Sequence, residues 1–286
     1  MVEQREVARA LDVGRLHGQY AATFTHIIGD STETLRSLVT SAPRPILLSS
    51  WRPEVYDDLL KLEPSLKFHP LSHDVAPGLN ALNQIRDIIL GAYVEGFFGS
   101  QDRILCVTRI GEHFEAILFC DMRYDESVTR LKKDLEGRAD IRVIETVLQI
   151  AGEIAREGRE RGHVGAIFVI GDTERVLRNS RQVVINPFHG HPPEDRDILD
   201  PSTWETAKEF SQIDGAFVVR EDGIIEAAGR YIEVKNPVPL PSGLGGRHLA
   251  AAAVSKETKA IAVAVSETGV IRIFKDGEIL MRIGTS

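Results

Sequence analysis

The chain has 286 residues, of which 27% are charged, and its formal net charge is −8. This length exceeds that of a usual single domain, so we expect two domains, each long enough to bury a core. The acidic balance argues against nucleic acid as a partner, but it leaves room for a local group of arginines around a small phosphorylated ligand.

Cysteine usage and hydropathy indicate where the protein works. Cys106 and Cys120 lie in apolar runs without the spacing of metal ligands, which indicates buried free thiols and a reducing compartment. Residues 1–20 are charged and amphipathic rather than an apolar signal core, and no apolar run approaches the roughly 20 residues that cross a bilayer. We therefore expect a soluble cytoplasmic protein with no membrane partner.

Strand-like and helix-like segments alternate through the first half of the chain. The expected strands are residues 25–30, 44–51, 66–72, 102–110 and 114–122, and the expected helices are residues 31–42, 53–63 and 78–98. This alternation predicts a small α/β layered domain over residues 1–125, with a regulatory or oligomerising role as the candidate function.

The second half opens on an amphipathic pattern. Apolar residues recur at three- and four-residue spacing from 141 to 160, which predicts a helix with Gly162 as its C-terminal cap. The apolar run 165–170 then indicates a buried strand. A second domain therefore begins between about residues 124 and 140, and we assign it residues 126–286.

Further elements follow in the second domain. We expect a polar loop over 185–204, a helix over 203–213 with Asp200 or Ser202 as its cap, and strands over 216–220 and 223–229. A glycine-rich segment then leads into a helix, and residues 261–283 form a final hairpin.

Three Asp-Gly pairs occur in different settings. Asp222-Gly223 and Asp276-Gly277 each lie between two strand-like runs, which is typical of hairpin turns. Asp214-Gly215 instead follows a helix and precedes a strand. A glycine there would let a ligand or a neighbouring backbone approach the Asp214 carboxylate closely, although an ordinary turn or cap is an equal alternative.

A glycine-rich loop feeds the last expected helix. The stretch GLGGRHLAAAAVS, residues 243–255, presents unobstructed backbone N–H groups at the positive end of a helix dipole. Arg247 and His248 would add charge-assisted donors to a bound phosphate, and the alanines permit close helix packing. The stretch is neither a dinucleotide-binding fingerprint nor a P-loop, and glycine loops without a phosphate ligand are common.

Histidines offer weaker candidates. His69 and His73 have a proline between them, which argues against one helical face, so we interpret both as surface or partly buried. A group of two histidines and three carboxylates in the polar loop 185–204 is a candidate metal site, but we favour its interpretation as a solvated acidic loop. Its members are His189, His191, Glu194, Asp195 and Asp197.

Four segments in this order resemble the diadenylate cyclase (DAC) domain, which condenses two ATP into the second messenger cyclic di-AMP. They are GAIFVIGDTERVL, DGAFVV, GLGGRHLAAAAVS and VSETG, and the resemblance covers roughly residues 141–283. It implies a mixed-sheet α/β domain. The α/β pattern of the first half resembles the first domain of archaeal diadenylate cyclases, which is similar to the C-terminal domain of pyruvate kinase.

The resemblance also implies site residues. Asp214 of the Asp-Gly-Ala motif would hold a divalent metal, Mg²⁺ or Mn²⁺, near the reacting hydroxyl. Arg247 and His248 would bind the triphosphate and act in catalysis, and Ser266 and Glu267 would lie near phosphate or metal, with Glu267 as a further candidate metal ligand. The remaining implied ATP-binding residues are Gly215, Ala216, Gly243, Leu244, Gly245 and Gly246.

The chain departs from the family pattern at two positions. Many members carry Arg-His-Arg, but here Leu249 replaces the second arginine, so one phosphate contact is missing or supplied elsewhere. The later motif often carries two glutamates, and here only Glu267 stands before Thr268. These departures leave a non-catalytic sensor of ATP or cyclic di-AMP as the alternative to a cyclase.

The implied product predicts an assembly. Cyclic di-AMP is a symmetric ring of two AMP units, whereas the chain has no internal repeat and only one copy of each motif. One chain would therefore bind one ATP, and two half-sites would face each other in a homo-oligomer, most simply across a twofold axis.

Overall fold

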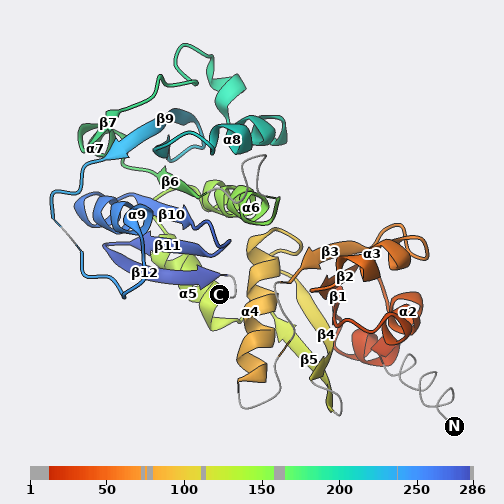
Figure 1. Cartoon of the computed structure of the whole chain (residues 1–286). Coiled ribbons are helices and arrows are strands. Elements are labelled where there is room, and N and C mark those ends of the chain that lie inside the picture. The colour runs from red at the N-terminus through yellow and green to blue at the C-terminus, as the bar shows by residue number, and fades with distance from the viewer. Residues whose placement is uncertain are drawn as a thin grey trace, which may run out of the picture. The chain divides into compact units, whose positions relative to one another are not determined.

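The computed structural model describes residues 13–71, 75, 80–110, 114–157, 165–236 and 238–283. The chain divides into two compact units, Met1–Thr129 and Arg130–Ser286 (Figure 1). Within these described residues, each unit contains one sheet, with five strands in the first and seven in the second. The domain boundary predicted at residue 125 falls close to this division.

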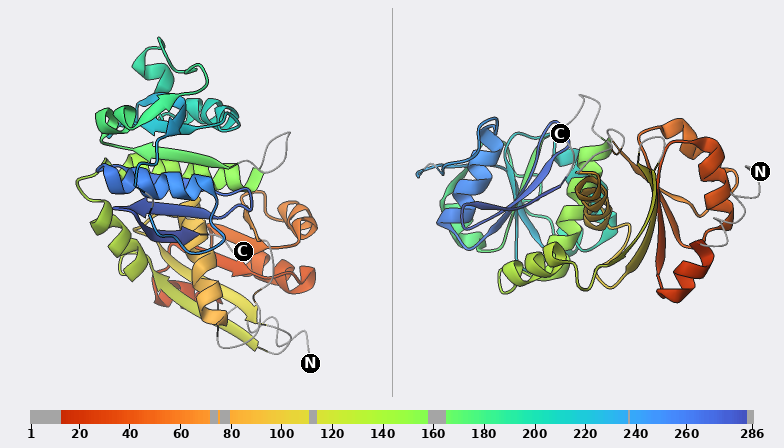
Figure 2. Two further views of the ribbon diagram at one scale, coloured as in Figure 1. Left: turned by 60° about the vertical axis from the view of Figure 1, so that its left-hand side comes forward. Right: turned by 90° about the horizontal axis from the view of Figure 1, so that it is seen from below.

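The first unit is a layered α/β structure. Its sheet has the order β3-β2-β1-β4-β5, and its strands are parallel except for β5, which runs antiparallel to β4. Helices α2 and α3 cover one face of this sheet and α4 covers the other (Figure 2). The strands are β1 (Phe24–Ile28), β2 (Ile46–Ser50), β3 (Lys67–Pro70), β4 (Arg103–Ile110) and β5 (Phe114–Asp121), and the helices are α2 (Thr32–Ser41), α3 (Pro53–Leu60) and α4 (Ala81–Val94).

A buried polar chain lies among the parallel strands of the first unit. Ser49 Oγ is 2.7 Å from His26 Nε2 and 2.9 Å from His69 Nδ1, and His69 Nε2 lies 3.4 Å from Glu95 Oε1. His69 is only 5% exposed, so its interpretation as a surface or partly buried residue is wrong, because the hydroxyl and the carboxylate satisfy its ring nitrogens in the interior. His73 lies outside the described residues.

The second unit has the mixed sheet that the resemblance implies. Its order is β12-β11-β10-β6-β8-β9-β7, in which β6 and β8 are parallel and every other neighbouring pair is antiparallel. The chain is therefore an α/β protein in both units, as predicted. The strands are β6 (Ala166–Ile170), β7 (Ser180–Gln182), β8 (Ala216–Val219), β9 (Ile225–Ile232), β10 (Ile261–Val265), β11 (Ile271–Lys275) and β12 (Glu278–Ile283).

Two long helices, α6 and α9, cover opposite faces of this sheet (Figure 2). Both faces of the central strands are therefore buried, and every residue of β6, β8 and β10 is inaccessible to solvent or nearly so. The helices are α5 (Glu126–Leu135), whose first four residues belong to the first unit, α6 (Ile141–Glu157), α7 (Thr173–Arg178), α8 (Trp204–Phe210) and α9 (Gly246–Glu257), and 3₁₀ turns occupy Pro193–Arg196 and Pro201–Thr203.

The second unit differs from the sequence prediction in several elements. Helices α5 and α7 and strand β7 were not predicted, and residues 261–283 form three strands rather than one hairpin. Asp200 caps the 3₁₀ turn before α8, accepting a hydrogen bond of 2.9 Å from the amide of Ser202. The predicted cap Gly162 lies outside the described residues.

Both predicted Asp-Gly hairpin turns are confirmed. Asp222-Gly223 joins β8 to β9, and Asp276-Gly277 joins β11 to β12 with φ angles of 53° and 87°. Cys106 is a buried free thiol, as predicted, whereas Cys120 is only partly buried because it lies on the edge strand β5. Among the described residues, no helix combines the length and the apolar character needed to cross a membrane.

Candidate active site

Strand pairing brings the sequence motifs to one end of the second sheet. Ala166 at the start of β6 lies opposite Val265 at the end of the antiparallel β10, so Ser266 lies beside Gly165. The parallel strand β8 begins at the same end, where Asp214 precedes it.

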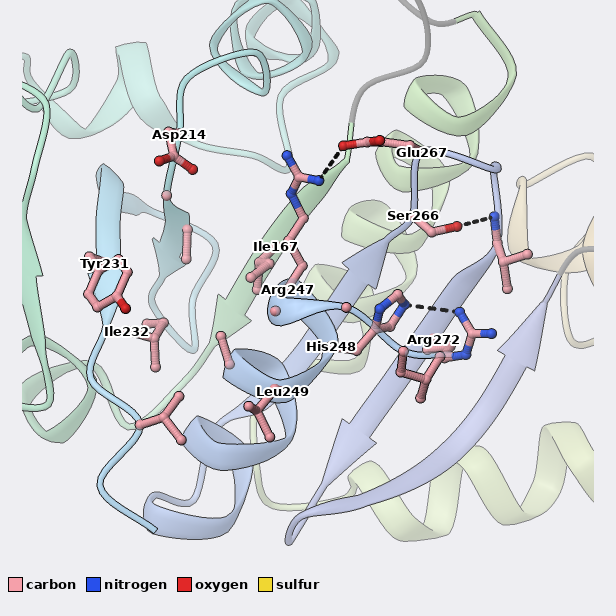
Figure 3. Close-up of a pocket in the computed structure, with 18 of the residues that line it drawn as sticks. Ile167, Asp214, Tyr231, Ile232, Arg247, His248, Leu249, Ser266, Glu267 and Arg272 are labelled. Carbon is pink, nitrogen blue, oxygen red and sulfur yellow. Dashed lines mark hydrogen bonds and ion pairs between the residues drawn. The ribbon is translucent and has the colours of Figure 1, made fainter. Parts of the chain in front are cut away.

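A cavity of about 900 Å³ opens at this end of the sheet (Figure 3). Three stretches that are distant in the chain bring the predicted site residues to it: the Asp-Gly-Ala motif, the glycine loop with the first turn of α9, and the turn between β10 and β11. Every predicted site residue lines it, namely Asp214, Gly215, Ala216, Gly243, Leu244, Gly245, Gly246, Arg247, His248, Ser266 and Glu267.

Asp214 lines the cavity and is followed by Gly215, a position at which the backbone requires glycine. Gly215 has a φ of +116°, and a Cβ built there would lie 2.6 Å from the carbonyl carbon of Gly229 on β9. The neighbouring backbone therefore approaches closely, one of the two reasons that the sequence suggested. Asp214 itself is exposed, and no hydrogen bond or ion pair of its carboxylate occurs among the described residues.

The glycine loop leaves open space in front of α9. Cβ atoms built at Gly243, Gly245 and Gly246 would meet nothing within 4 Å, so larger residues would place side chains in this space. Gly245 is the N-cap and provides no side chain to cap the first amides of the helix. These amides and the helix dipole are therefore available to an anion.

Arg247 projects from the first turn of α9 over Gly165. Its Nη1 donates to Glu267 Oε1 at 2.8 Å, and this ion pair is exposed, with side-chain exposures of 43% and 68% (Figure 3). A Cβ on Gly165 would lie 2.7 Å from Arg247 Nη1. Gly165 therefore leaves the space that the guanidinium occupies.

We expect Gly165→Ala to weaken anion binding at this site while it preserves the fold. The new methyl would displace the end of a flexible side chain rather than backbone, so it would move Arg247 without removing its charge. Calorimetric titration of the variant with ATP should show a several-fold loss of affinity. In the Arg247→Ala background, Gly165→Ala should cause no further loss of ATP affinity. Additive losses of affinity in the double variant would show that Gly165 does not act through Arg247.

The buried His248 and the partly buried Arg272 form a hydrogen-bonded pair beside Arg247. Arg272 Nη1 lies 2.9 Å from His248 Nε2 (Figure 3), and because a guanidinium only donates, Nε2 must accept and the ring proton resides on Nδ1. His248 is 6% exposed. Burial lowers the pKa of His248, and the nearby Arg272 and Arg247 lower this pKa further, so the ring is neutral near pH 7.

Ser266 has a structural role in the turn between β10 and β11. Its Oγ lies 2.9 Å from Thr268 Oγ1 and accepts from the amide of Val270 at 3.0 Å. The hydroxyl thus closes the turn that carries Glu267 into the cavity.

The cavity also contains charged and aromatic residues that the sequence analysis missed. Arg230 and Tyr231 come from β9, and Arg272 comes from β11. Arg230 donates to Ser180 Oγ at 3.0 Å and to the carbonyls of Leu177 and Ser180 at 2.6 Å each, so it ties β9 to β7. The available signal was an arginine inside each of these two strands.

A divalent metal fits the site through Asp214. No group of three or more His, Cys, Asp or Glu side chains that could hold a metal occurs among the described residues. Mg²⁺ commonly binds one or two carboxylates together with substrate phosphates, and the exposed, unengaged Asp214 matches that arrangement. Glu267, the other candidate ligand, is already paired with Arg247.

Comparison with known proteins identifies the family of the second unit. Residues 153–279 match the family model described as "DAC: DisA bacterial checkpoint controller nucleotide-binding". The diadenylate cyclase of Methanocaldococcus jannaschii is 42% identical over 183 residues, which are 64% of this chain and 55% of that protein. The match therefore spans about half the length of that relative.

Similarities to three further proteins are found. The diadenylate cyclase of Haloferax volcanii is 34% identical over 209 residues, which are 71% of this chain and 76% of that protein. A double mutant of DacA from Staphylococcus aureus matches 51% of this chain and 89% of its own, with 21% identity and a TM-score of 0.35. A pyruvate kinase of Cryptosporidium parvum in complex with ADP matches 40% of this chain and 23% of its own, with 20% identity and a TM-score of 0.32. With a relative at 34% identity aligned over three quarters of its length, and with the family's motifs gathered around one cavity, the chain belongs to the diadenylate cyclase family.

Proposed function

We propose that the protein is a diadenylate cyclase, which converts two ATP into cyclic di-AMP and two pyrophosphate. The observation that carries this proposal is the cavity itself. It places a glycine loop, a helix N-terminus and Arg247 opposite an unengaged carboxylate, Asp214. Cationic donors facing a carboxylate that can hold a divalent metal suit a nucleoside triphosphate.

Each part of the cavity has a role in this reaction. Arg247 and the first amides of α9 bind the triphosphate. His248 accepts a hydrogen bond from Arg272 at this end of the site. Asp214 holds Mg²⁺ or Mn²⁺, which when bound neutralises developing charge on the reacting phosphate. The remaining contribution of the protein is to position the reactants, because it needs to form no covalent bond with the substrate in a phosphoryl-type transfer.

Ring closure requires two copies of the site. A 3′-hydroxyl of one nucleotide must lie roughly 3 Å from the α-phosphorus of the other, in line with the departing pyrophosphate. The second unit has one such cavity among its described pockets, and one copy of each motif. We therefore propose that one chain binds one ATP and that two chains face each other across a twofold axis.

Product analysis tests the activity. Purified chain is incubated with ATP and Mg²⁺ or Mn²⁺, and the products are identified by mass spectrometry. Cyclic di-AMP with two equivalents of pyrophosphate is the expected result. Binding of ATP without release of pyrophosphate would instead support the non-catalytic sensor, for which the departures at Leu249 and Thr268 provide the motivation.

Arg247→Ala should weaken ATP binding as well as turnover. The guanidinium would contact phosphate in the ground state and the transition state alike, and a charge-assisted hydrogen bond of this kind corresponds to a roughly 10- to 100-fold change in affinity. Calorimetry with ATP measures the first effect and pyrophosphate release the second. An unchanged affinity for ATP would remove Arg247 from the phosphate site.

Activity should depend on assembly. Specific activity should fall on dilution once the face-to-face assemblies dissociate, and excess Asp214→Asn chains should inhibit the parent chain where subunits exchange. Light scattering recorded alongside the assay gives the fraction of assembled chains. A strictly monomeric chain with constant specific activity across dilution would contradict the facing arrangement. A regulatory or oligomerising role of the first unit and a cytoplasmic location stay predictions.

A further inference from the structure

Arg272 is a cation flanked by apolar residues in strand β11. It stands between the buried Ile271 and Ile273 of β11, and alternation along the strand places it on the same face as Phe274. Phe274 packs in the core against the alanines of α9. Arg272 therefore projects toward α9, at the end of the strand where the cavity opens.

The charge of Arg272 lacks compensation within the described part of the chain. No ion pair with a carboxylate occurs there, and the residue directly across the β11–β12 ladder is another cation, Arg282. Burial lowers the pKa of the Arg272 guanidinium, and repulsion from Arg282 lowers it further. A half-buried cation opposite a like charge is destabilising, and an anionic ligand in the cavity would offset that cost.

The hydrogen bond to His248 engages only part of the guanidinium. A guanidinium has five N–H donors, and among the described residues Arg272 makes one hydrogen bond, to His248 Nε2. Arg230, the other strand arginine at the cavity, differs because its donors are engaged by Ser180 and Leu177. Of these two, Arg272 has more donors left for a ligand, because Arg230 Nη1 also lies 3.5 Å from Gln182 Oε1.

Helix α9 itself lacks a second cation near its N-terminus. Leu249 lines the cavity where the family resemblance places a second arginine. We propose that Arg272 contacts a phosphate group of the bound nucleotide, and so supplies from β11 the cation that α9 lacks at Leu249. This inference rests on the proposed binding of a nucleoside triphosphate, but not on its turnover.

Binding of inorganic tripolyphosphate tests the contact directly, because this probe has the charge of the ligand without its nucleoside. The full-length parent chain, Arg272→Gln and Arg282→Gln are titrated by calorimetry with tripolyphosphate and with ATP. Arg272→Gln should weaken both ligands by the same factor, about tenfold or more. Arg282→Gln, which removes the neighbouring cation outside the cavity, should leave both affinities within about twofold.

Three results would overturn the proposal. They are tripolyphosphate binding by Arg272→Gln within about twofold of the parent, a loss seen with ATP alone, and no binding of tripolyphosphate to the parent chain. Should Arg272→Gln fail to fold, Arg272→Lys decides instead. An ammonium cannot reproduce the planar fork that reaches His248 and a phosphate together, so a several-fold loss is expected and an unchanged affinity contradicts the contact.

The same data separate this inference from the proposed reaction. If Arg272→Gln binds tripolyphosphate more weakly but the parent chain makes no cyclic di-AMP, the Arg272 contact is supported and the proposed cyclase reaction is contradicted. If the parent chain makes cyclic di-AMP and Arg272→Gln binds tripolyphosphate as tightly as the parent, the reaction is supported and the Arg272 contact is contradicted.

Discussion

Asp214→Asn should retain the fold and lose nearly all cyclase activity. Asparagine keeps the shape of the side chain and removes the charge that would hold the metal. Since the Asp214 carboxylate makes no described hydrogen bond or ion pair, the substitution breaks no structural contact among the described residues. Loss of one electrostatic catalytic group commonly costs on the order of 10² to 10³ in rate. The measurement is pyrophosphate release per folded chain at saturating ATP and metal.

An acidic residue beyond the other end of β8 provides the control for Asp214→Asn. Asp222→Asn removes the same charge from a turn outside the cavity, where Asp222 pairs with Arg220. It should leave turnover within about twofold of the parent, because an exposed ion pair contributes little. If Asp214→Asn turned over ATP as fast as this control, the assignment of Asp214 as the metal ligand would be wrong.

Gly215→Ala should destabilise the second unit as well as abolish activity. The φ of +116° is a conformation that L side chains rarely adopt, and the added Cβ would overlap the backbone of Gly229 and Arg230 at 2.6 to 2.8 Å. Neither strand can yield easily, because β8 and β9 are paired in the sheet. Backbone strain and overpacking together should lower the free energy of unfolding by about 2 kcal/mol or more. Denaturant unfolding measures this loss.

Gly246→Ala is the matched control for Gly215→Ala. A Cβ at Gly246 meets nothing within 4 Å, and alanine suits the first turn of α9. Its free energy of unfolding should therefore be unchanged or slightly higher. The new methyl would still enter the space proposed for the triphosphate, so ATP affinity should fall. Equal stability of the two variants would contradict the backbone argument at Gly215.

Local patterns in the sequence predicted much of the fold. Continuous apolar runs such as 165–170 indicated buried strands, and all eight expected elements of the first unit formed. Helix α7, which has only six residues, was not predicted because it contains fewer than two turns of periodic pattern. Helix α5 was missed because half of its ten residues are charged, although Val128 and Leu135 among its described side chains are buried.

Some residues of the candidate site could be predicted from short motifs, whereas others depend on contacts between distant parts of the chain. Asp214 and the loop before Arg247 could be recognised because each lies in a short motif with an unusual setting. Arg272 could not, since its place beside His248 depends on the packing of β11 against α9. The ion pair of Arg247 with Glu267 likewise joins residues 20 positions apart, and no pattern in the sequence specifies that contact.

A structure of the chain with 3′-deoxy-ATP and Mg²⁺ tests the central claim most directly, because this analogue lacks the hydroxyl that would react. The account predicts one analogue per chain in the cavity, with its triphosphate at the N-terminus of α9 beside Arg247 and the metal on Asp214. An analogue bound away from the cavity, or bound there with its phosphates turned away from α9, would contradict it.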